Sequence, residues 1–338
     1  MNHKNHRGDG KVSSTISNYL SKLEFGKPLK YKNMGVIPLF TSIDSIEYLT
    51  LKEALNKKLL IITEVSKGGA VPELKVTNKA EMPVLLLDGE ELVGAKQNRI
   101  LNTTILLKEK SETIIPVSCT EQGRWSYISD KFNVSDVIAA HNIRAKKASS
   151  VSANLSNSNE FVSDQFEVWN EIDRIARNTN IHSETGAMKD IFYAKMEDLD
   201  KFLEAFKCEP HQKGLLITIN GEVVGFDAIS LESAYKKLHP KLVKSYAMDA
   251  LLQKKKKSVL PSIEKAKTFI KEAISAHGKK YKSIGYGWDY RFESENIVGS
   301  ALIYNRNVIH TAFFRIEKSD EVGTIAGYDR RKHYRIYM

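Results

Sequence analysis

The sequence lacks most of the features that would place it in a protein class. It has only two cysteines, Cys119 and Cys208, far apart and outside any C-x-x-C pair, so we expect no disulfide framework. No apolar run approaches the roughly 20 residues of a membrane span. The first residues, "MNHKNHRGDGK", hold no hydrophobic segment, so we expect no secretory leader. These absences favour a reducing, cytoplasmic setting without a membrane partner.

Signatures of common enzymes are missing as well. The sequence has no G-x-x-x-x-G-K-[ST], no G-x-S-x-G and no H-E-x-x-H, which removes the usual marks of P-loop NTPases, α/β-hydrolases and zinc peptidases. No predicted helix follows "GYGWDY", so this string is not a dinucleotide-binding fingerprint. The nine histidines form no zinc-like pair with a nearby cysteine, and we expect no zinc site.

What is present is a globular composition with an excess of basic residues. Apolar residues make up 42% and charged residues 27% of the 338 residues, which is enough for a substantial core. The net charge of +10 attracts nucleic acid, nucleotides and other polyanions. Much of it lies in "QKKKK" (253–257) and "YDRRKHYR" (328–335), runs that are typical of solvated faces or loose ends.

Strand-like runs dominate the first half of the chain. A short amphipathic helix, "STISNYLSKL", a strand, "GVIPLF", and a helix, "IDSIEYLTLKEALNKKL", come first. Short apolar runs bounded by turn residues follow: "LIITEV", "ELKVTN", "PVLLLD", "ILNTTILL" and "TIIPVSC". Their spacing predicts an antiparallel β-sandwich or a barrel-like region.

The second half mixes helices with strands. "DQFEVWNEIDRIARN" and "MEDLDKFLEAF" have helical periodicity, and Asn220-Gly221 predicts a hairpin between two strands. We therefore predict an α+β fold, with the N-terminal β-rich region followed by a C-terminal α+β region. The predicted parts are an extension with a short helix (1–34), a β-rich domain (35–145), a Ser/Asn-rich linker or mobile loop (146–164), an α+β domain (165–318) and a basic tail (319–338).

The stretch "LLLDGEELVGAKQNRILNTTILL" places acids, amides and cations between two apolar runs. Asp88-Gly89 fits a plain I′ hairpin turn with exposed acids, or the stretch forms the edge of a polar site. Arg99 is able to bind a phosphate or carboxylate through two hydrogen bonds. Gly94 and Ala95 are small enough for a ligand or another backbone to approach closely.

A second polar group, "PVSCTEQGRWSY", follows a predicted strand. Arg124 beside Trp125 would hold a nucleotide by ion pairing and stacking. Alternatively, Arg124 pairs with an acid such as Glu121, and Trp125 covers the core. We expect Cys119 to be a small buried hydrophobe, because no neighbour in sequence would stabilise its thiolate.

These two groups define the candidate site. For a hydrolase, Glu90 or Glu91 is the candidate general base or metal ligand, Lys96 and Arg99 are the candidate phosphate holders, and Trp125 is the stacking surface. A Mg²⁺ site on Asp88, Glu90 and Glu91 stays open. The remaining candidate ligand-binding residues are Asp88, Gln97, Asn98, Asn102, Glu121 and Arg124.

Later candidates carry a weaker signal. Strand alternation places Asp289 and Arg291 on one face, opposite Trp288. His310 is more typical of a hydrogen-bonded sheet histidine than of a catalytic base. Asp227 follows a predicted strand without a visible partner.

The same strings carry a family resemblance. "LLLDGEELVGAKQNRILNTTILL", "IPVSCTEQGRWSY", "RAKKASSVSANL", "HPKLVKSYAMDAL" and "GSALIYNRNVIHTAFFR" resemble the ADP-ribosylglycohydrolase- and rhodanese-phosphatase-associated protein domain. The resemblance runs from Gly35 to Arg315, and the tail beyond Glu317 goes past the familiar pattern. It implies a link to NAD and ADP-ribose metabolism and supplies no catalytic residues.

Three hypotheses follow from these observations. The first is a protein that binds or processes an ADP-ribose-like or other phosphorylated nucleotide ligand. The second, ranked lower because no nucleic-acid motif supports it, is a nucleic-acid-binding module that relies on the net charge. The third is a non-catalytic sensor or sponge for a nucleotide signal. The oligomeric state leaves no trace in the sequence.

Overall fold

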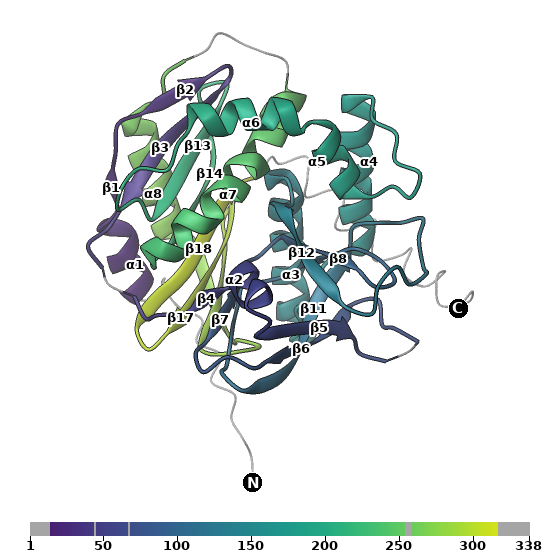
Figure 1. Ribbon diagram of the computed structural model, residues 1–338. Coiled ribbons are helices and arrows are strands. Elements are labelled where there is room, and N and C mark those ends of the chain that lie inside the picture. The colour runs from purple at the N-terminus through teal and green to yellow at the C-terminus, as the bar shows by residue number, and fades with distance from the viewer. Residues whose placement is uncertain (1–13, 44, 67, 254–258, 317–338) are drawn as a thin grey trace.

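The computed structural model of the chain describes residues 14–43, 45–66, 68–253 and 259–316 (Figure 1). The predicted loose start, the lysines of the "QKKKK" run and the basic tail lie outside the described residues. The described part has eight helices and eighteen strands, and the strands form mainly antiparallel sheets. This confirms the predicted α+β fold.

The largest sheet has nine strands, all paired antiparallel. They are β1 (Glu24–Phe25), β2 (Leu29–Tyr31), β3 (Met34–Phe40), β13 (Gly214–Ile219), β14 (Glu222–Ile229), β15 (His277–Lys282), β16 (Trp288–Glu293), β17 (Ile297–Tyr304) and β18 (Asn307–Arg315). Their order is β1-β3-β13-β14-β18-β17-β16-β15, with β2 also beside β3. Because β3 pairs with β13, this sheet joins the beginning and the end of the described chain, across the predicted domain division.

The predicted hairpin in this sheet is confirmed. Asn220 and Gly221 join β13 to β14 with φ values of +53° and +85°, the left-handed pair that a I′ turn requires.

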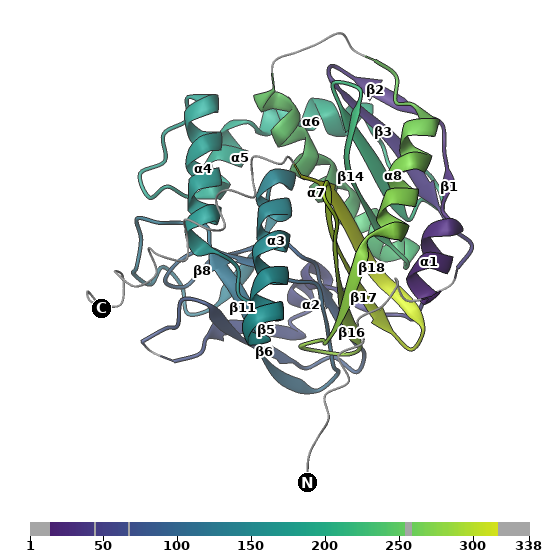
Figure 2. The ribbon, with the colours of Figure 1, turned by 180° about the vertical axis from the view of Figure 1, so that it is seen from behind.

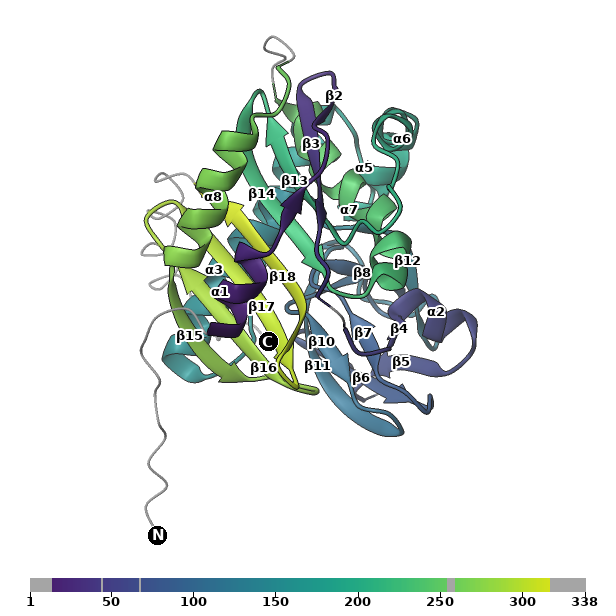
Figure 3. The ribbon, with the colours of Figure 1, turned by 90° about the vertical axis from the view of Figure 1, so that its left-hand side faces the viewer.

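Two smaller sheets form the β-rich half, which Figure 3 shows beside the nine-stranded sheet. The six-stranded sheet has the order β12 (Phe132–Ile138), β8 (Glu90–Gly94), β9 (Arg99–Leu101), β11 (Ser111–Cys119), β6 (Glu73–Asn78) and β5 (Leu60–Glu64). The three-stranded sheet has the order β10 (Ile105–Leu107), β7 (Val84–Leu86) and β4 (Leu49–Thr50), with β4 and β7 parallel. The predicted single run "ILNTTILL" is therefore two strands, interrupted by the polar residues 102–104.

Helices cover both faces of the nine-stranded sheet. α1 (Ser14–Ser21) and α8 (Ile263–Ser275) pack on one face, around Phe226 and Phe313 (Figure 3). The other face packs against α7 (Glu232–Leu252) and α3 (His141–Ser158) in the largest core cluster. α4 (Gln165–Thr179), α5 (Met188–Ala194) and α6 (Met196–Ala205) extend this layer, as Figure 2 shows from behind.

Two predicted segments differ from the structure. The long helix predicted over residues 43–59 is only α2 (Leu51–Asn56), because Thr50 and Glu53 form a capping box that starts the helix there. The segment 146–164, predicted to be a linker or mobile loop, is largely the helix α3, and its Val151 and Leu155 are buried. Burial against the sheets overrides the low helix propensity of its serines and asparagines. Over the described residues, no helix is long and apolar enough to cross a membrane.

Candidate functional site

A turn is present at Asp88-Gly89 just before β8, but it is not the I′ hairpin turn considered from the sequence. β7 pairs with β10 and β4, β8 pairs with β12 and β9, and only Gly89 of the two turn residues has a positive φ. Glu90 N donates to Leu87 O at 3.1 Å, and Gly89 has a φ of +78°, which a glycine adopts without strain. The exposed acids of a plain hairpin tip are not observed, because the exposed fractions of Asp88, Glu90 and Glu91 are 5%, 1% and 0%. Buried carboxylates need partners, and these three have different ones.

Asp88 faces α3, between the sheets. Its carboxylate accepts hydrogen bonds from Lys147 Nζ and, at 3.4 Å, from Arg144 Nε. Burial alone would raise the pKa of Asp88, but the two cations outweigh it and hold the pKa below its ordinary value. Lys147 also donates to the backbone oxygen of Asn102 at 3.1 Å. Asp88 and Asn102 therefore belong to a buried cluster around α3.

Arg144 connects α3 to the nine-stranded sheet. Its Nη1 and Nη2 donate to the Asp227 carboxylate at 3.0 Å and 2.5 Å, and Tyr246 donates to the same carboxylate at 2.7 Å. His310 Nε2 lies 3.2 Å from Asp227, and its Nδ1 lies 2.8 Å from Thr104 Oγ1. Both ring nitrogens have partners, as expected of a hydrogen-bonded sheet histidine.

Asp289 and Arg291 extend this cluster and share a face of β16, as predicted. Arg291 Nε donates to Asp289 Oδ1 at 2.6 Å, and Thr103 Oγ1 donates to Asp289 Oδ2 at 2.6 Å. We call the whole cluster the buried ion network. Its charged members are Asp88, Asp227 and Asp289, with Arg144, Lys147 and Arg291. Three carboxylates balance three cations, so the network fastens the β-rich half to the nine-stranded sheet.

Glu90 faces α7. Its Oε1 accepts from Lys241 Nζ at 2.9 Å, and its Oε2 accepts from the backbone N–H of Leu87 at 3.0 Å. Both carboxylate oxygens are thus used within the fold.

Glu91 faces the opposite side of β8. Its Oε1 accepts from Thr120 Oγ1 at 3.0 Å, whereas its Oε2 has no hydrogen-bond partner within the described part of the chain. Burial raises the pKa of Glu91 to about 7, although the Thr120 and Ser135 hydroxyls oppose the rise. Of the two acids considered for catalysis, only Glu91 keeps an unbonded oxygen.

The proposed Mg²⁺ ligands do not converge on one point. Asp88, Glu90 and Glu91 turn towards α3, α7 and Thr120 respectively. Among the residues with a described placement, no group of three His, Cys, Asp or Glu side chains is gathered as a metal site requires.

The tip between β8 and β9 lies under the loop that joins β11 to β12. A Cβ added to Gly94 would come within 2.8 Å of the Lys131 backbone oxygen, so another backbone makes the close approach there. Ile128 N donates to Ala95 O at 3.1 Å. The tip is therefore buried, and the loop covers it.

Arg124 and Glu121 hold this loop on the tip. Arg124 Nε and Nη2 donate to the Glu121 carboxylate at 2.9 Å and 2.6 Å, and Nη1 donates to Ala95 O at 2.7 Å. Glu121 Oε2 also accepts from the backbone N–H of Asn98 at 3.2 Å. This arrangement is the structural alternative left open by the sequence, in which Arg124 pairs with an acid instead of a ligand.

Arg99 is buried in the same tip and is largely unpaired. Its exposed fraction is 0%, and its Nη1 donates to Gln97 Oε1 at 3.0 Å and to Asn98 O at 3.3 Å. Its Nε and Nη2 have no hydrogen-bond partner among the described residues. Burial lowers the pKa of the guanidinium, although it stays charged at any physiological pH. These two nitrogens form the edge of the guanidinium that binds phosphates and carboxylates side-on.

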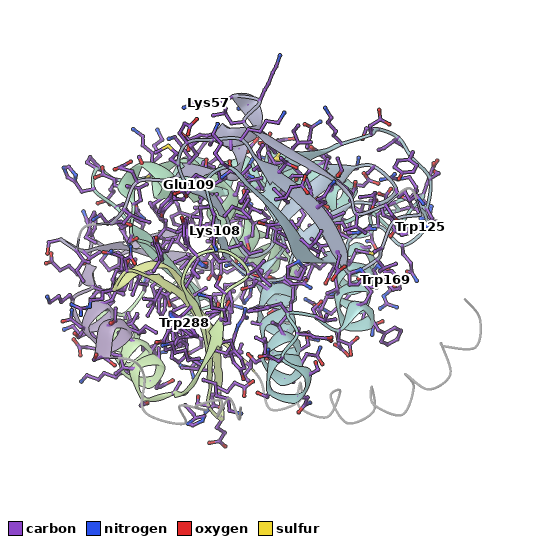
Figure 4. The ribbon with its side chains drawn as sticks, turned by 90° about the horizontal axis from the view of Figure 1, so that it is seen from below. Lys57, Lys108, Glu109, Trp125, Trp169 and Trp288 are labelled. Carbon is purple, nitrogen blue, oxygen red and sulfur yellow. The ribbon has the colours of Figure 1, made fainter. Side chains whose placement is uncertain are left out.

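Aromatic rings cover Arg99. Its Cζ lies 5.6 Å from the centre of the Trp125 ring, and Lys96 Nζ lies 5.2 Å from the centres of both Trp125 and Tyr127. The exposed fractions of Trp125 and Tyr127 are 46% and 48%, so the cover itself faces solvent. Figure 4 shows Trp125 at the periphery of the molecule.

Glu64, at the end of β5, was not predicted from sequence. Its Oε1 accepts from Lys96 N at 3.4 Å, and its Oε2 has no hydrogen-bond partner in the described part of the chain. It lines a pocket of about 430 Å³ with Thr63, Ser66, Tyr127 and Asp130. We call Glu64, Lys96, Arg99, Trp125 and Tyr127 the Arg99 site. Acids at strand ends are common, so the sequence does not single out Glu64. Only its proximity to Lys96 in the folded chain identifies it as part of the site.

Comparison with known protein families shows which family the chain belongs to. Residues 22–314 match the ARG and Rhodanese-Phosphatase-superfamily-associated Protein domain, ARPP-1. The chain belongs to this family. Neither a curated protein nor a solved structure matches the chain. The ARPP-1 match includes both the buried ion network and the Arg99 site, whose members all lie between residues 64 and 291.

Proposed function

We propose that this ARPP-1 protein binds a small phosphorylated nucleotide at the Arg99 site, with ADP-ribose as the first ligand to test. The observation that carries the proposal is the Arg99 guanidinium, which is fully buried while its Nε and Nη2 have no hydrogen-bond partner among the described residues. A buried unpaired cation is costly for folding, so its retention indicates a role outside folding.

The neighbours of Arg99 match the parts of a nucleotide. The Nε and Nη2 edge suits a phosphate, the free oxygen of Glu64 suits a ribose hydroxyl, and the rings of Trp125 and Tyr127 suit a base. Lys96 adds a second cation close to both rings. A carboxylate beside the phosphate position disfavours simple phosphate and favours a ligand that also carries donor hydroxyls.

Entry requires movement of Trp125, because its ring lies over the guanidinium. Arg124 and Ile128 keep the loop bonded to Ala95, but the Trp125 side chain is itself about half exposed, so the ring can turn without opening the loop. The Glu121–Arg124 pair anchors the start of the loop and lets Trp125 turn without loss of the tip.

Isothermal titration of the full chain tests the proposal. ADP-ribose and AMP should bind, whereas adenosine, which lacks the phosphate, should bind weakly. Arg99→Met should weaken the phosphorylated ligands by about 30- to 1,000-fold, the usual effect of removing one partner of a buried charged pair. Arg177→Met, at an exposed arginine on α4, is the matched control and should bind as the parent chain does.

Three outcomes have defined meanings. Equal binding by Arg99→Met and the parent chain rejects the site. Recovery of intact ligand after denaturation marks a binding protein or a sensor. Conversion of the ligand to products supports hydrolysis. Because the β8–β9 register places Glu91 on the sheet face opposite Arg99, Glu91→Gln should leave that turnover unchanged, and a loss of turnover in this variant would assign the reaction to the Glu91 side of the sheet.

A further inference from the structure

The outer hairpin of the nine-stranded sheet carries a basic and aromatic surface that has no part in the Arg99 site. Lys282 lies opposite Trp288, and Lys280 lies opposite Tyr290, in the register of β15 and β16. Residues directly opposite in an antiparallel pair share a face, so these four side chains lie together. We call Lys280, Lys282, Trp288 and Tyr290 the Trp288 strip.

The lysines of the strip lie over its rings. Lys280 Nζ is 4.0 Å from the centre of the Trp288 ring and 6.0 Å from that of Tyr290, and Lys282 Nζ is 5.1 Å from that of Trp288. Neither lysine makes an ion pair with a carboxylate among the residues that the structure describes. Their charges are therefore available to an external anion.

The strip is accessible in the fold. β15 is the last strand of the nine-stranded sheet, and among the described residues no further strand pairs beyond it. α8 packs over Phe292 in the core, while Trp288, four residues earlier on β16, keeps an exposed fraction of 42%. Figure 4 places Trp288 well apart from Trp125, so the two surfaces are separate.

We propose that the Trp288 strip binds single-stranded nucleic acid. Sequence-tolerant binding of single strands combines ring faces for stacked bases with cations for the phosphates, and the strip has both within one hairpin. Trp288 and Tyr290 are two residues apart on one strand, about 7 Å, so successive unstacked bases can reach successive rings. The lysine ammonium groups move from the rings to the phosphates as the bases stack.

A peptide added as a strand to the β15 edge is the competing partner. Such a partner uses backbone hydrogen bonds, and edge lysines oppose it. It would gain little from the ring of Trp288, because this residue lies on β16, one strand in from the β15 edge, and its side chain lies on a face of the sheet. The ring-and-cation pairing therefore favours nucleic acid.

Fluorescence anisotropy with a short labelled oligothymidylate, on the full chain, tests this proposal. Trp288→Ala should raise the Kd by about 5- to 100-fold, the effect of losing one stacked base, and Trp288→Phe should restore most of the binding. Because the lysines outside the described residues contribute a background that depends on charge alone, the test relies on these two charge-neutral substitutions.

A second measurement uses the salt dependence of binding. Joint replacement of Lys280 and Lys282 by Ala should reduce the slope of log Kd against log salt by about 1.4, or about 0.7 for each phosphate contact. Joint replacement of the exposed Lys207 and Lys236 by Ala is the charge-matched control. It should not reproduce the reduction in slope that loss of Lys280 and Lys282 causes, and it should not alter the effect of Trp288→Ala. Equal binding by Trp288→Ala and the parent chain, or duplex DNA binding as tightly as the single strand, overturns the proposal.

Discussion

Two buried arginines, Arg144 on α3 and Arg99 on β9, have opposite surroundings. Arg144 donates to Asp227 through two nitrogens and to Asp88 through a third, inside a network whose charges balance. Arg99 is equally buried, yet only its Nη1 has partners among the described residues, and these are a neutral amide and a backbone oxygen. The first arginine completes the fold, whereas the second keeps an unbonded edge at which we propose a ligand binds.

The two arginines differ in how far hydrogen-bonded partners compensate for the cost of burying their charge. Burial strongly disfavours an isolated charge, and only paired geometry compensates for it. In the buried ion network, burial alone would raise the pKa of Asp227. Arg144 and His310 outweigh burial and hold this pKa below its ordinary value. Around Arg99 the compensation is incomplete. This incomplete compensation distinguishes the Arg99 tip from the buried ion network and is the reason for proposing a ligand there.

The largest expected effect comes from Arg144→Met. Loss of the guanidinium leaves Asp227 and Asp88 buried with fewer partners, so the free energy of unfolding should fall by about 3 to 5 kcal/mol. Urea denaturation followed by circular dichroism measures this change. Arg174→Met, at a partly exposed arginine on α4, is the comparison and should cost far less. If Arg144→Met lowered the free energy of unfolding by less than Arg174→Met does, the network would not stabilise the fold.

The next effect is a change in the pH dependence of stability on Glu91→Gln. The folded-state pKa of Glu91 is raised to about 7 from 4.5, so the folded chain keeps a proton that the unfolded chain releases between these two pH values. Stability of the parent chain therefore falls as pH rises through this range. Because glutamine never ionises, the variant should be more stable at pH 8 by about 3 kcal/mol and nearly equal below pH 4.5.

Thermal unfolding of both chains over this pH range checks the prediction. The control is Glu90→Gln, which breaks an ion pair with Lys241 and should destabilise the fold at neutral pH. A pH profile of Glu91→Gln that runs parallel to that of the parent chain would place the Glu91 carboxylate in a wetter environment than the structure shows.

The elements of the fold were largely predictable, because their signals are local. The apolar runs of β5, β6, β7 and β11 and the Asn220-Gly221 turn depend on neighbouring residues alone. The helix α3 was not, since its serines and asparagines are poor helix formers and only burial between the sheets makes them helical. Residues 102–104 broke a predicted strand for a similar reason, since Thr103 and Thr104 bond to partners more than 180 residues away.

The site was predictable only in part. The cluster from Lys96 to Arg99 and the Glu121 to Trp125 segment, which the sequence analysis assigned to one candidate site, meet in the structure. Asp88, Glu90 and Asn102 turn into the fold instead, because their partners Lys147 and Lys241 lie on helices that no local pattern connects to them. Whether an arginine is paired or unpaired is a property of three-dimensional packing, and no sequence pattern reports it.

Arg99 is proposed to serve a ligand and not the fold. The free energy of unfolding of Arg99→Met, without ligand, tests this proposal most directly. A methionine of similar length removes a buried unpaired charge and keeps the packing under Trp125, so the variant should be as stable as the parent chain or more stable by about 1 kcal/mol. A loss of about 3 kcal/mol or more, as expected for Arg144→Met, would show that Arg99 is a structural residue and would contradict the account.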